Sequence, residues 1–161
     1  MCGIAGYFNP DQNYAENPKQ NFHTLSRMIN TMNHRGPDTY GHTIINSCCL
    51  AHTRLSIIDL ENGRQPMSYT KDGNTYYIVY NGEIYNYKEV KKTLLRKNYT
   101  FETNSDTEVI IAAFCHYGPG FVKELNGIFA IAIYDSMRNT LYLYRDRFGV
   151  KPFYYTKTGD K

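Results

Sequence analysis

The chain has 161 residues, 42% of them apolar, which suits one compact domain with a sizeable core. Its net charge is +3 with acidic and basic residues interspersed, so no basic stripe indicates a nucleic-acid partner. No apolar run approaches the ~18 residues of a membrane span and no signal-peptide pattern opens the chain, so we expect a cytoplasmic protein with no membrane partner.

The N-terminal half predicts strands around one helix. Residues 3–8 predict a short buried strand, and residues 9–21 form a polar loop with two prolines. Apolar residues at helical spacing predict a helix from Phe22, which ends at the HRGPD segment. Residues 42–58 predict two strands separated by an Asn-Ser pair.

The C-terminal half predicts a strand, two helices and three closing strands. A loop precedes the strand, the second helix begins with the capping-box pattern Ser105-x-x-Glu108, and residues 136–139 form a hairpin turn between the first two closing strands. In order, these are the loop 61–67, the strand 75–80, the helices 88–95 and 105–118, and the strands 127–135, 140–146 and 151–155.

The order of these elements favours an α+β fold with mainly antiparallel sheets over a doubly wound βαβ fold. Several strands are nearly continuous apolar runs, so both faces of their sheets are expected to be covered. Two packed sheets with helices outside would satisfy this pattern.

The four cysteines include one candidate nucleophile. Cys48, Cys49 and Cys115 lie in apolar segments and predict core packing, and because no CxxC pair exists we predict no metal site. Cys2 follows the start methionine. If Met1 is removed, the α-amino group of Cys2, with a pKa of roughly 8, becomes a base beside a thiol whose pKa is about 8.5. The alternative is a chance cysteine at a frayed chain end.

Three further features match the chemistry of glutamine, although each has a structural explanation. Asn81-Gly82 predicts a type I′ hairpin turn, or an oxyanion hole made of the Asn amide and the Gly N–H. Arg54 is either a packed surface arginine or a carboxylate ligand. Asp106 either caps a helix or holds an ammonium group. Together with Cys2, these residues describe a site for an amino acid that carries a side-chain amide.

The chain contains, in order, the eight motifs MCGIAGYF, HRGPDTYG, AHTRLSIIDL, RQPM, YNGEIYNY, SDTEVI, LNGIFAIAIYD and RDRFGVKPFYY. Together they resemble the glutamine amidotransferase domain of glutamine-hydrolysing asparagine synthetases. The resemblance implies a class II, N-terminal-nucleophile amidotransferase with a four-layer αββα sandwich. It implies Cys2 as the nucleophile and Asn81 and Gly82 as the oxyanion hole. It also implies that glutamine is bound by Arg54, Leu55, Ser56, Ile57, Ile58, Asn81, Gly82, Glu83 and Asp106.

By this resemblance, residues 1–161 form a glutaminase domain that is truncated at its C-terminal end. The synthetase domain, which would use Mg-ATP to convert aspartate to asparagine, is absent from the chain, and the glutaminase step needs no cofactor. A homodimer is a further expectation. Two alternatives stay open: an amidotransferase with a different carboxylate acceptor, and a non-catalytic domain that binds glutamine or docks a partner.

Overall fold

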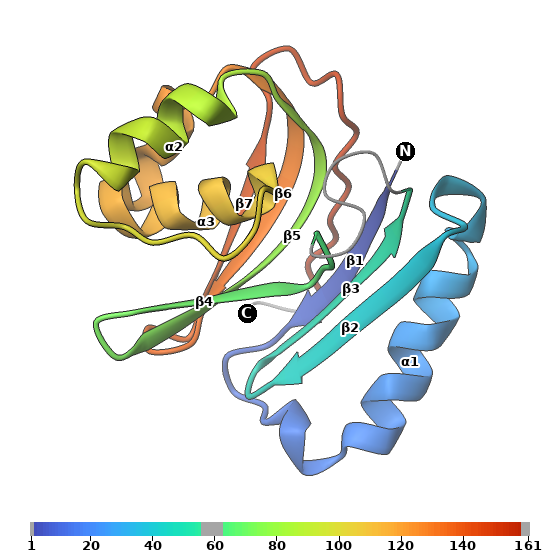
Figure 1. The fold of residues 1–161 in the computed structure, drawn as a ribbon. Helices are drawn as coiled ribbons and strands as arrows, with labels where there is room; N and C mark the ends of the chain where they lie inside the picture. Colours follow the sequence, from blue (N-terminus) through green and yellow to red (C-terminus); the bar gives the residue numbers. More distant parts are fainter. Residues whose placement is uncertain (1, 56–62, 159–161) are drawn as a thin grey trace.

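The computed structural model describes residues 2–55 and 63–158 and shows two antiparallel sheets face to face between outer helices (Figure 1). The expected α+β sandwich of two antiparallel sheets is confirmed. The strands are β1 (Gly3–Phe8), β2 (Thr39–Ile45), β3 (Cys48–Arg54), β4 (Met67–Lys71), β5 (Asn74–Ile84), β6 (Gly127–Asp135) and β7 (Thr140–Arg145). The helices are α1 (Pro18–Asn30), α2 (Tyr87–Leu95) and α3 (Asp106–Tyr117), with 3-10 turns at Tyr14–Glu16, Asn33–Arg35 and Gly118–Glu124.

The first sheet has the strand order β1-β3-β2 and carries α1 on its outer face (Figure 1). Every residue of the central strand β3 is buried, because the strand is covered on both sides. Leu25 and Ile29 of α1 pack on Cys49 and Ala51, whereas the alternate residues of β3 face the other sheet. The first sheet therefore places alternate side chains of β3 between the two sheets.

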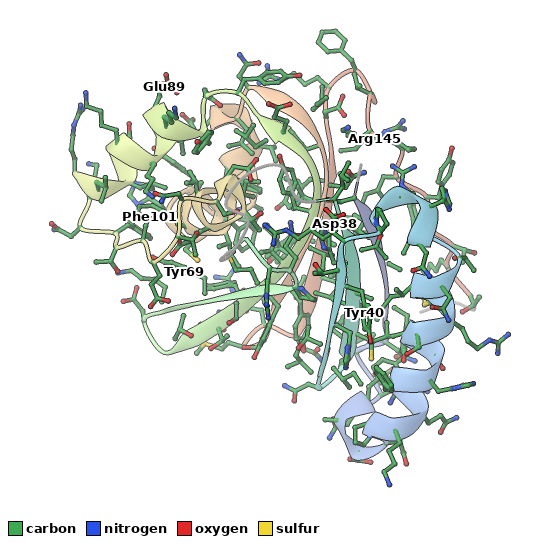
Figure 2. All side chains as sticks on the ribbon, turned by 45° about the vertical axis from the view of Figure 1, so that its right-hand side comes forward. Asp38, Tyr40, Tyr69, Glu89, Phe101 and Arg145 are labelled. Atoms are coloured by element: carbon green, nitrogen blue, oxygen red, sulfur yellow. The ribbon has the colours of Figure 1, made fainter. Side chains whose placement is uncertain are left out.

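The second sheet has the strand order β4-β5-β6-β7, and its outer face is covered by α2 and α3 (Figure 1). Residues 106–114 of α3 are all buried, and this helix packs on alternate β5 residues such as Ile78, Tyr80 and Ile84. Figure 2 shows Tyr69 and Phe101 beside this helical layer, and both pack partly buried against the same core. Val90 and Leu94 of α2 are buried, whereas Leu95 is 51% exposed.

The element boundaries correct several expectations from the sequence. The first helix begins at Pro18, four residues before Phe22, because proline is well suited to the first helical position. The strand β4 was not expected, although the Asp72-Gly73 turn after it, with both φ angles positive, is a strong hairpin signal. The expected strand over 151–155 is wrong, since these residues pair with no described strand.

The predicted N-cap Ser105 and the predicted Asn-Ser connection are in place, whereas the predicted capping box with Glu108 is wrong. Ser105 caps α3 by accepting a hydrogen bond from the Thr107 N–H at 3.2 Å. Glu108 completes the cap differently from a capping box, because its carboxylate accepts from the N–H groups of Glu102 and Thr103, both at 2.8 Å.

Cys48 and Cys49 are buried as expected, and Cys115 is partly buried. Within the described residues, no helix is long and apolar enough to cross a membrane.

Candidate active site

Cys2 lies immediately before β1, at the end of the first sheet where β3 also ends. β1 pairs antiparallel with β3, so Gly3 lies opposite Thr53, and the Gly3 N–H donates to the Thr53 hydroxyl at 3.1 Å. The Cys2 Sγ lies 3.5 Å from the Leu55 backbone nitrogen and 3.7 Å from the Leu55 carbonyl oxygen. The thiol is therefore held at a strand end rather than in a frayed terminus, and Cys2 is only partly buried.

The HRGPD segment holds the Cys2 backbone from the other side. The Arg35 Nε donates to the Cys2 carbonyl oxygen at 3.2 Å. Gly36 packs against the end of β3 so closely that a Cβ on it would lie 2.6 Å from the Arg54 nitrogen. Asp38, labelled in Figure 2, donates its N–H to the Arg54 carbonyl oxygen at 3.1 Å. This motif therefore does more than end the first helix: it packs beside the nucleophile.

Asn81 and Gly82 do not form a hairpin turn; they lie inside β5, opposite Ala130 and Phe129 of β6. Long-range pairing with β6 overrides the local Asn-Gly turn signal. A Cβ on Gly82 would collide with the Ile128 carbonyl oxygen and lie 2.8 Å from the Phe129 Cα, so this position requires glycine. The strand end expected at Tyr80 is therefore wrong by four residues.

The hydrogen bonds of neighbouring residues show where the Gly82 N–H points. Both the N–H and the carbonyl of Phe129 bond to Asp146 on the far side of β6, so the pair Gly82–Phe129 does not exchange hydrogen bonds. On β5, the Tyr80 N–H donates to the Gln65 Oε1 at 2.6 Å, and the Ile84 N–H is 3.5 Å from the Asp106 Oδ2. Alternate N–H groups share one edge, so the Gly82 N–H faces this same edge, beyond the end of β4.

Asp106 is the first residue of α3, and its side chain is 6% exposed. Its Oδ2 accepts a hydrogen bond from the Tyr80 hydroxyl at 2.9 Å in addition to the Ile84 N–H. Burial raises the pKa of Asp106, while hydrogen bonds from Tyr80 and from nearby backbone N–H groups oppose this rise. A buried carboxylate beside the β5 edge is suited to an ammonium partner.

The structure brings most of the predicted site residues to one place. Burial raises the pKa of Tyr80 well above 10, and the charges of Asp106, Glu83 and Cys2 raise it further. These three groups therefore lie within electrostatic range of the phenol, and Asp106 contacts it directly. Arg54 ends β3 with its side chain 5% exposed, directly before Leu55. The predicted ligands Ser56, Ile57 and Ile58, together with Met1, lie outside the described residues.

A buried histidine also connects the two sheets near this site. His52 on β3 is 1% exposed, and its Nε2 has no hydrogen-bond partner among the described residues. Burial and the charge of Arg54 lower the pKa of His52 to about 4, although a hydrogen bond to the Tyr80 backbone acts in the opposite direction. The ring is therefore neutral near pH 7 and is poorly suited to carry a charge in the site.

A groove along α1 is a poorer candidate for the site. It is lined by side chains of β1, of α1 and of the two residues that follow α1, namely Ala5, Thr24, Arg27, Met28, Thr31 and Met32. Arg27 could meet a carboxylate there, but the lining contains no acidic residue for an ammonium group. By contrast, the candidate site that includes Cys2 has both a buried cation, Arg54, and a buried anion, Asp106.

Sequence reasoning missed Arg35, Gln65 and Tyr80 as site residues. The motifs HRGPD, RQPM and YNGEIYNY contain them, but their contacts join segments that are distant in the chain. Gln65 connects the Tyr80 N–H to the Thr107 hydroxyl, which it reaches at 3.2 Å. No local pattern shows such a bridge, because the side-chain types alone do not reveal which backbone groups lack a strand partner.

The fold is shared with solved structures of longer chains. Solved structures with this fold include an allosteric regulatory enzyme of purine biosynthesis and the glutamine phosphoribosylpyrophosphate amidotransferase of Bacillus subtilis. Each matches with a TM-score of 0.55 and 21% identity, over 68% of this chain. The match covers 26% of the first of these chains and 25% of the second, and at this identity it shows the shared fold alone.

Sequence comparison is more specific. The family described as "Glutamine amidotransferase domain" matches residues 1–161, and this chain belongs to it. The chain is 43% identical, over 99% of its length, to asparagine synthetase [glutamine-hydrolyzing] 3 of Bacillus subtilis, and 40% identical, over 96%, to asparagine synthetase B of Escherichia coli. It is 37% identical, over 97%, to the amidase chyE of Penicillium rubens. The chain spans about a quarter of the length of these three relatives: 25%, 26% and 24%.

Proposed function

We propose that this chain hydrolyses glutamine to glutamate and ammonia, with Cys2 as the nucleophile after removal of Met1. The observation that carries the proposal is that the Tyr80 hydroxyl bonds to the buried Asp106 carboxylate at the β5 edge that the Gly82 N–H also faces, while the Cys2 thiol is held at the end of β3. The site thus combines a partly exposed thiol, a buried carboxylate and the N–H group of Gly82.

The reaction follows from these groups. The Cys2 Sγ attacks the side-chain carbonyl carbon of glutamine, and the α-amino group of Cys2 takes the thiol proton. The Asn81 amide and the Gly82 N–H stabilise the tetrahedral oxyanion, which typically contributes several kcal/mol. The amine then gives its proton to the departing ammonia, leaving a thioester on Cys2. Water hydrolyses the thioester, and glutamate is released.

The same residues account for recognition of the amino-acid end of glutamine. Arg54 is suited to the α-carboxylate, because a guanidinium binds a carboxylate through two parallel hydrogen bonds. Asp106 is suited to the α-ammonium group. Leu55, Ser56, Ile57, Ile58 and Glu83 complete the proposed binding residues. This step needs no cofactor.

We further propose that the ammonia serves a synthetase portion like that of the longer relatives, which would bind Mg-ATP and convert aspartate to asparagine. Relatives named asparagine synthetase support this acceptor, since they match almost the whole of this chain with about a quarter of their own length. A homodimer remains a prediction. We place the protein in the cytoplasm, because a reducing compartment keeps the Cys2 thiol free.

A second candidate acceptor is a different carboxylate. Relatives named amidase, in Penicillium rubens and Gibberella zeae, are each 37% identical to this chain and support it. The glutaminase step would be the same in both cases, so ammonia release from glutamine tests what the two candidates share.

Substitution of the nucleophile tests the proposal. Cys2→Ala should abolish ammonia release from glutamine, whereas Cys115→Ala, which removes a partly buried thiol from α3, should retain it. Intact mass should show that Met1 is absent from the active protein, because a blocked amine cannot act as a base. Normal hydrolysis by the Cys2→Ala variant would overturn the assignment of the nucleophile.

A further inference from the structure

Tyr80 lies between β5 and α3 at the centre of the candidate site. Its side chain is 3% exposed, and its hydroxyl donates to the Asp106 Oδ2 at 2.9 Å. A Cβ on Gly82 would lie 2.7 Å from the Cε2 of the Tyr80 ring, so the ring packs directly against the proposed oxyanion donor. The phenol therefore contacts both the ammonium-binding and the oxyanion-binding parts of the site.

The hydroxyl of Tyr80 acts as a hydrogen-bond donor at any working pH. Burial, followed by the charge of Asp106 and the hydrogen bond to it, raises the pKa of Tyr80 well above 10. A protonated phenol bonded to a buried carboxylate makes a charge-assisted hydrogen bond, which is stronger than a bond between neutral groups. The Ile84 N–H approaches the same Oδ2 at 3.5 Å, so two β5 residues contact one oxygen of Asp106.

We propose that Tyr80 is a positioning residue: its hydroxyl fixes the Asp106 carboxylate in the orientation that receives the α-ammonium group of glutamine. This inference rests on the proposed glutaminase function, and it assigns to the phenol a role in substrate recognition. Tyr80 does not touch the reacting carbonyl, so its removal should weaken recognition of the amino group more than it slows the chemistry.

The hydroxyl also favours the ionised form of the buried Asp106 carboxyl. Among the described residues, the other titratable or charged groups near this contact are Glu83 on β5, Cys2 before β1, and His52 on β3, which bonds to the Tyr80 backbone and feels the charge of Arg54. Gln65 and Thr107 are neutral. Burial raises the pKa of Asp106, and the hydrogen bond from Tyr80 lowers it. Loss of the hydroxyl therefore raises the pKa of Asp106 further, so the carboxylate protonates at higher pH and the ammonium loses its partner there.

Tyr80→Phe tests the proposal, because it deletes one hydroxyl and keeps the ring. We expect the KM for glutamine to rise roughly tenfold, with kcat changed less than about threefold, as for lost ground-state binding to a charged group. The acid limb of kcat/KM should move to higher pH. The matched control is Tyr144→Phe, because this buried hydroxyl on β7 has no hydrogen-bond partner among the described residues. The control should keep the wild-type KM.

Two further measurements separate positioning from general damage. Alkylation of Cys2 by iodoacetamide, which lacks the amino-acid end of glutamine, should proceed at the wild-type rate in Tyr80→Phe. In the Asp106→Asn background, Tyr80→Phe should add little to the rise in KM and should not move the acid limb, because the two residues act through one contact. This background also excludes titration of Glu83 or Cys2 as the cause.

The outcomes distinguish this inference from the proposed function. An unchanged KM in Tyr80→Phe, with wild-type hydrolysis intact, overturns the role of Tyr80 and leaves the glutaminase function standing. Additive effects of Tyr80→Phe and Asp106→Asn also overturn the role. If the wild-type protein with a free Cys2 amine releases no ammonia from glutamine, the proposed function fails first. A slower alkylation of Cys2 in Tyr80→Phe would indicate a disturbed fold and would contradict positioning.

Discussion

Two buried aspartates of this molecule, Asp106 and Asp146, have similar exposure but opposite electrostatic character. Their side chains are 6% and 5% exposed, respectively. Asp146 accepts four backbone N–H groups, from Phe129 at 3.2 Å, Phe148 at 3.1 Å, Val150 at 2.9 Å and Lys151 at 2.9 Å, two on each oxygen. Burial raises the pKa of Asp146, but these hydrogen bonds more than offset it and the net pKa is lowered.

For Asp106, burial outweighs the hydrogen bonds, so its pKa stays above the usual value. Among the described residues, the Oδ2 of Asp106 accepts one close hydrogen bond, from the Tyr80 hydroxyl, and a longer contact from the Ile84 N–H. The two aspartates differ in how many close hydrogen bonds stabilise their charge. This difference distinguishes a carboxylate that organises a loop from one that can bind a cationic ligand. The loop carboxylate is fully supplied with donors, whereas the site carboxylate still gains from an added cation.

The largest effect expected is on the stability of the Asp146 loop. Asp146→Ala leaves four backbone N–H groups without their acceptor, two of them in buried hydrogen bonds, so we expect the free energy of unfolding to fall by about 4 kcal/mol. Asp146→Asn, which keeps one accepting oxygen, should lose roughly half as much. Urea unfolding measures both. A loss below about 1 kcal/mol in the alanine variant would show that water replaces the carboxylate.

The next effect is on recognition by Asp106. Asp106→Asn removes the charge but keeps an oxygen that can accept from Tyr80, so we expect the KM for glutamine to rise roughly a hundredfold. The free energy of unfolding should change by less than about 1 kcal/mol, because a charge that burial disfavours is removed. Steady-state ammonia release and urea unfolding check the two parts. A large loss of stability with an unchanged KM would reverse the assignment of the two aspartates.

The smallest effect is the pH dependence of stability, which should have opposite signs at the two sites. The folded pKa of Asp146 is lowered, so its contribution is present above about pH 4 and is lost as the pH falls further. The folded pKa of Asp106 is raised, so its contribution is present below about pH 4 and is lost as the pH rises through the folded value.

Urea midpoints of the two Asn variants between about pH 3 and 7 measure this difference. Relative to the wild type, Asp106→Asn should become more stable as the pH rises, and Asp146→Asn should become less stable. Parallel curves for the two variants would contradict the contrast between the sites.

Much of the fold could be predicted because its signals are local. The connection after Ile45 follows from an Asn-Ser pair whose Asn46 has a positive φ, and α3 begins at the predicted cap Ser105 and ends before Gly118. The same kind of signal misled at Asn81-Gly82, because nine consecutive pairs between β5 and β6 outweigh a turn preference of two residues.

The candidate site was predicted by residue type but not by contact. Cys2, Arg54 and Asp106 were expected from the chemistry that glutamine requires. Tyr80 was not, because its role depends on reaching Asp106, 26 residues further along the chain. Likewise, the sequence RDRFG does not show that Asp146 gathers backbone N–H groups of its own loop and of β6. Such roles depend on the folded backbone, which supplies half of each hydrogen bond.

The start of β4 at Met67 has a consequence for solubility. Within the described residues, β5 has no strand partner on this side beyond Ile78, and an unpaired strand edge favours pairing with other chains and aggregation. Here Gln65 and Asp106 cap the Tyr80 and Ile84 N–H groups that an intruding strand would need. These two contacts occupy backbone donors of β5, so a second polypeptide finds fewer groups with which to pair.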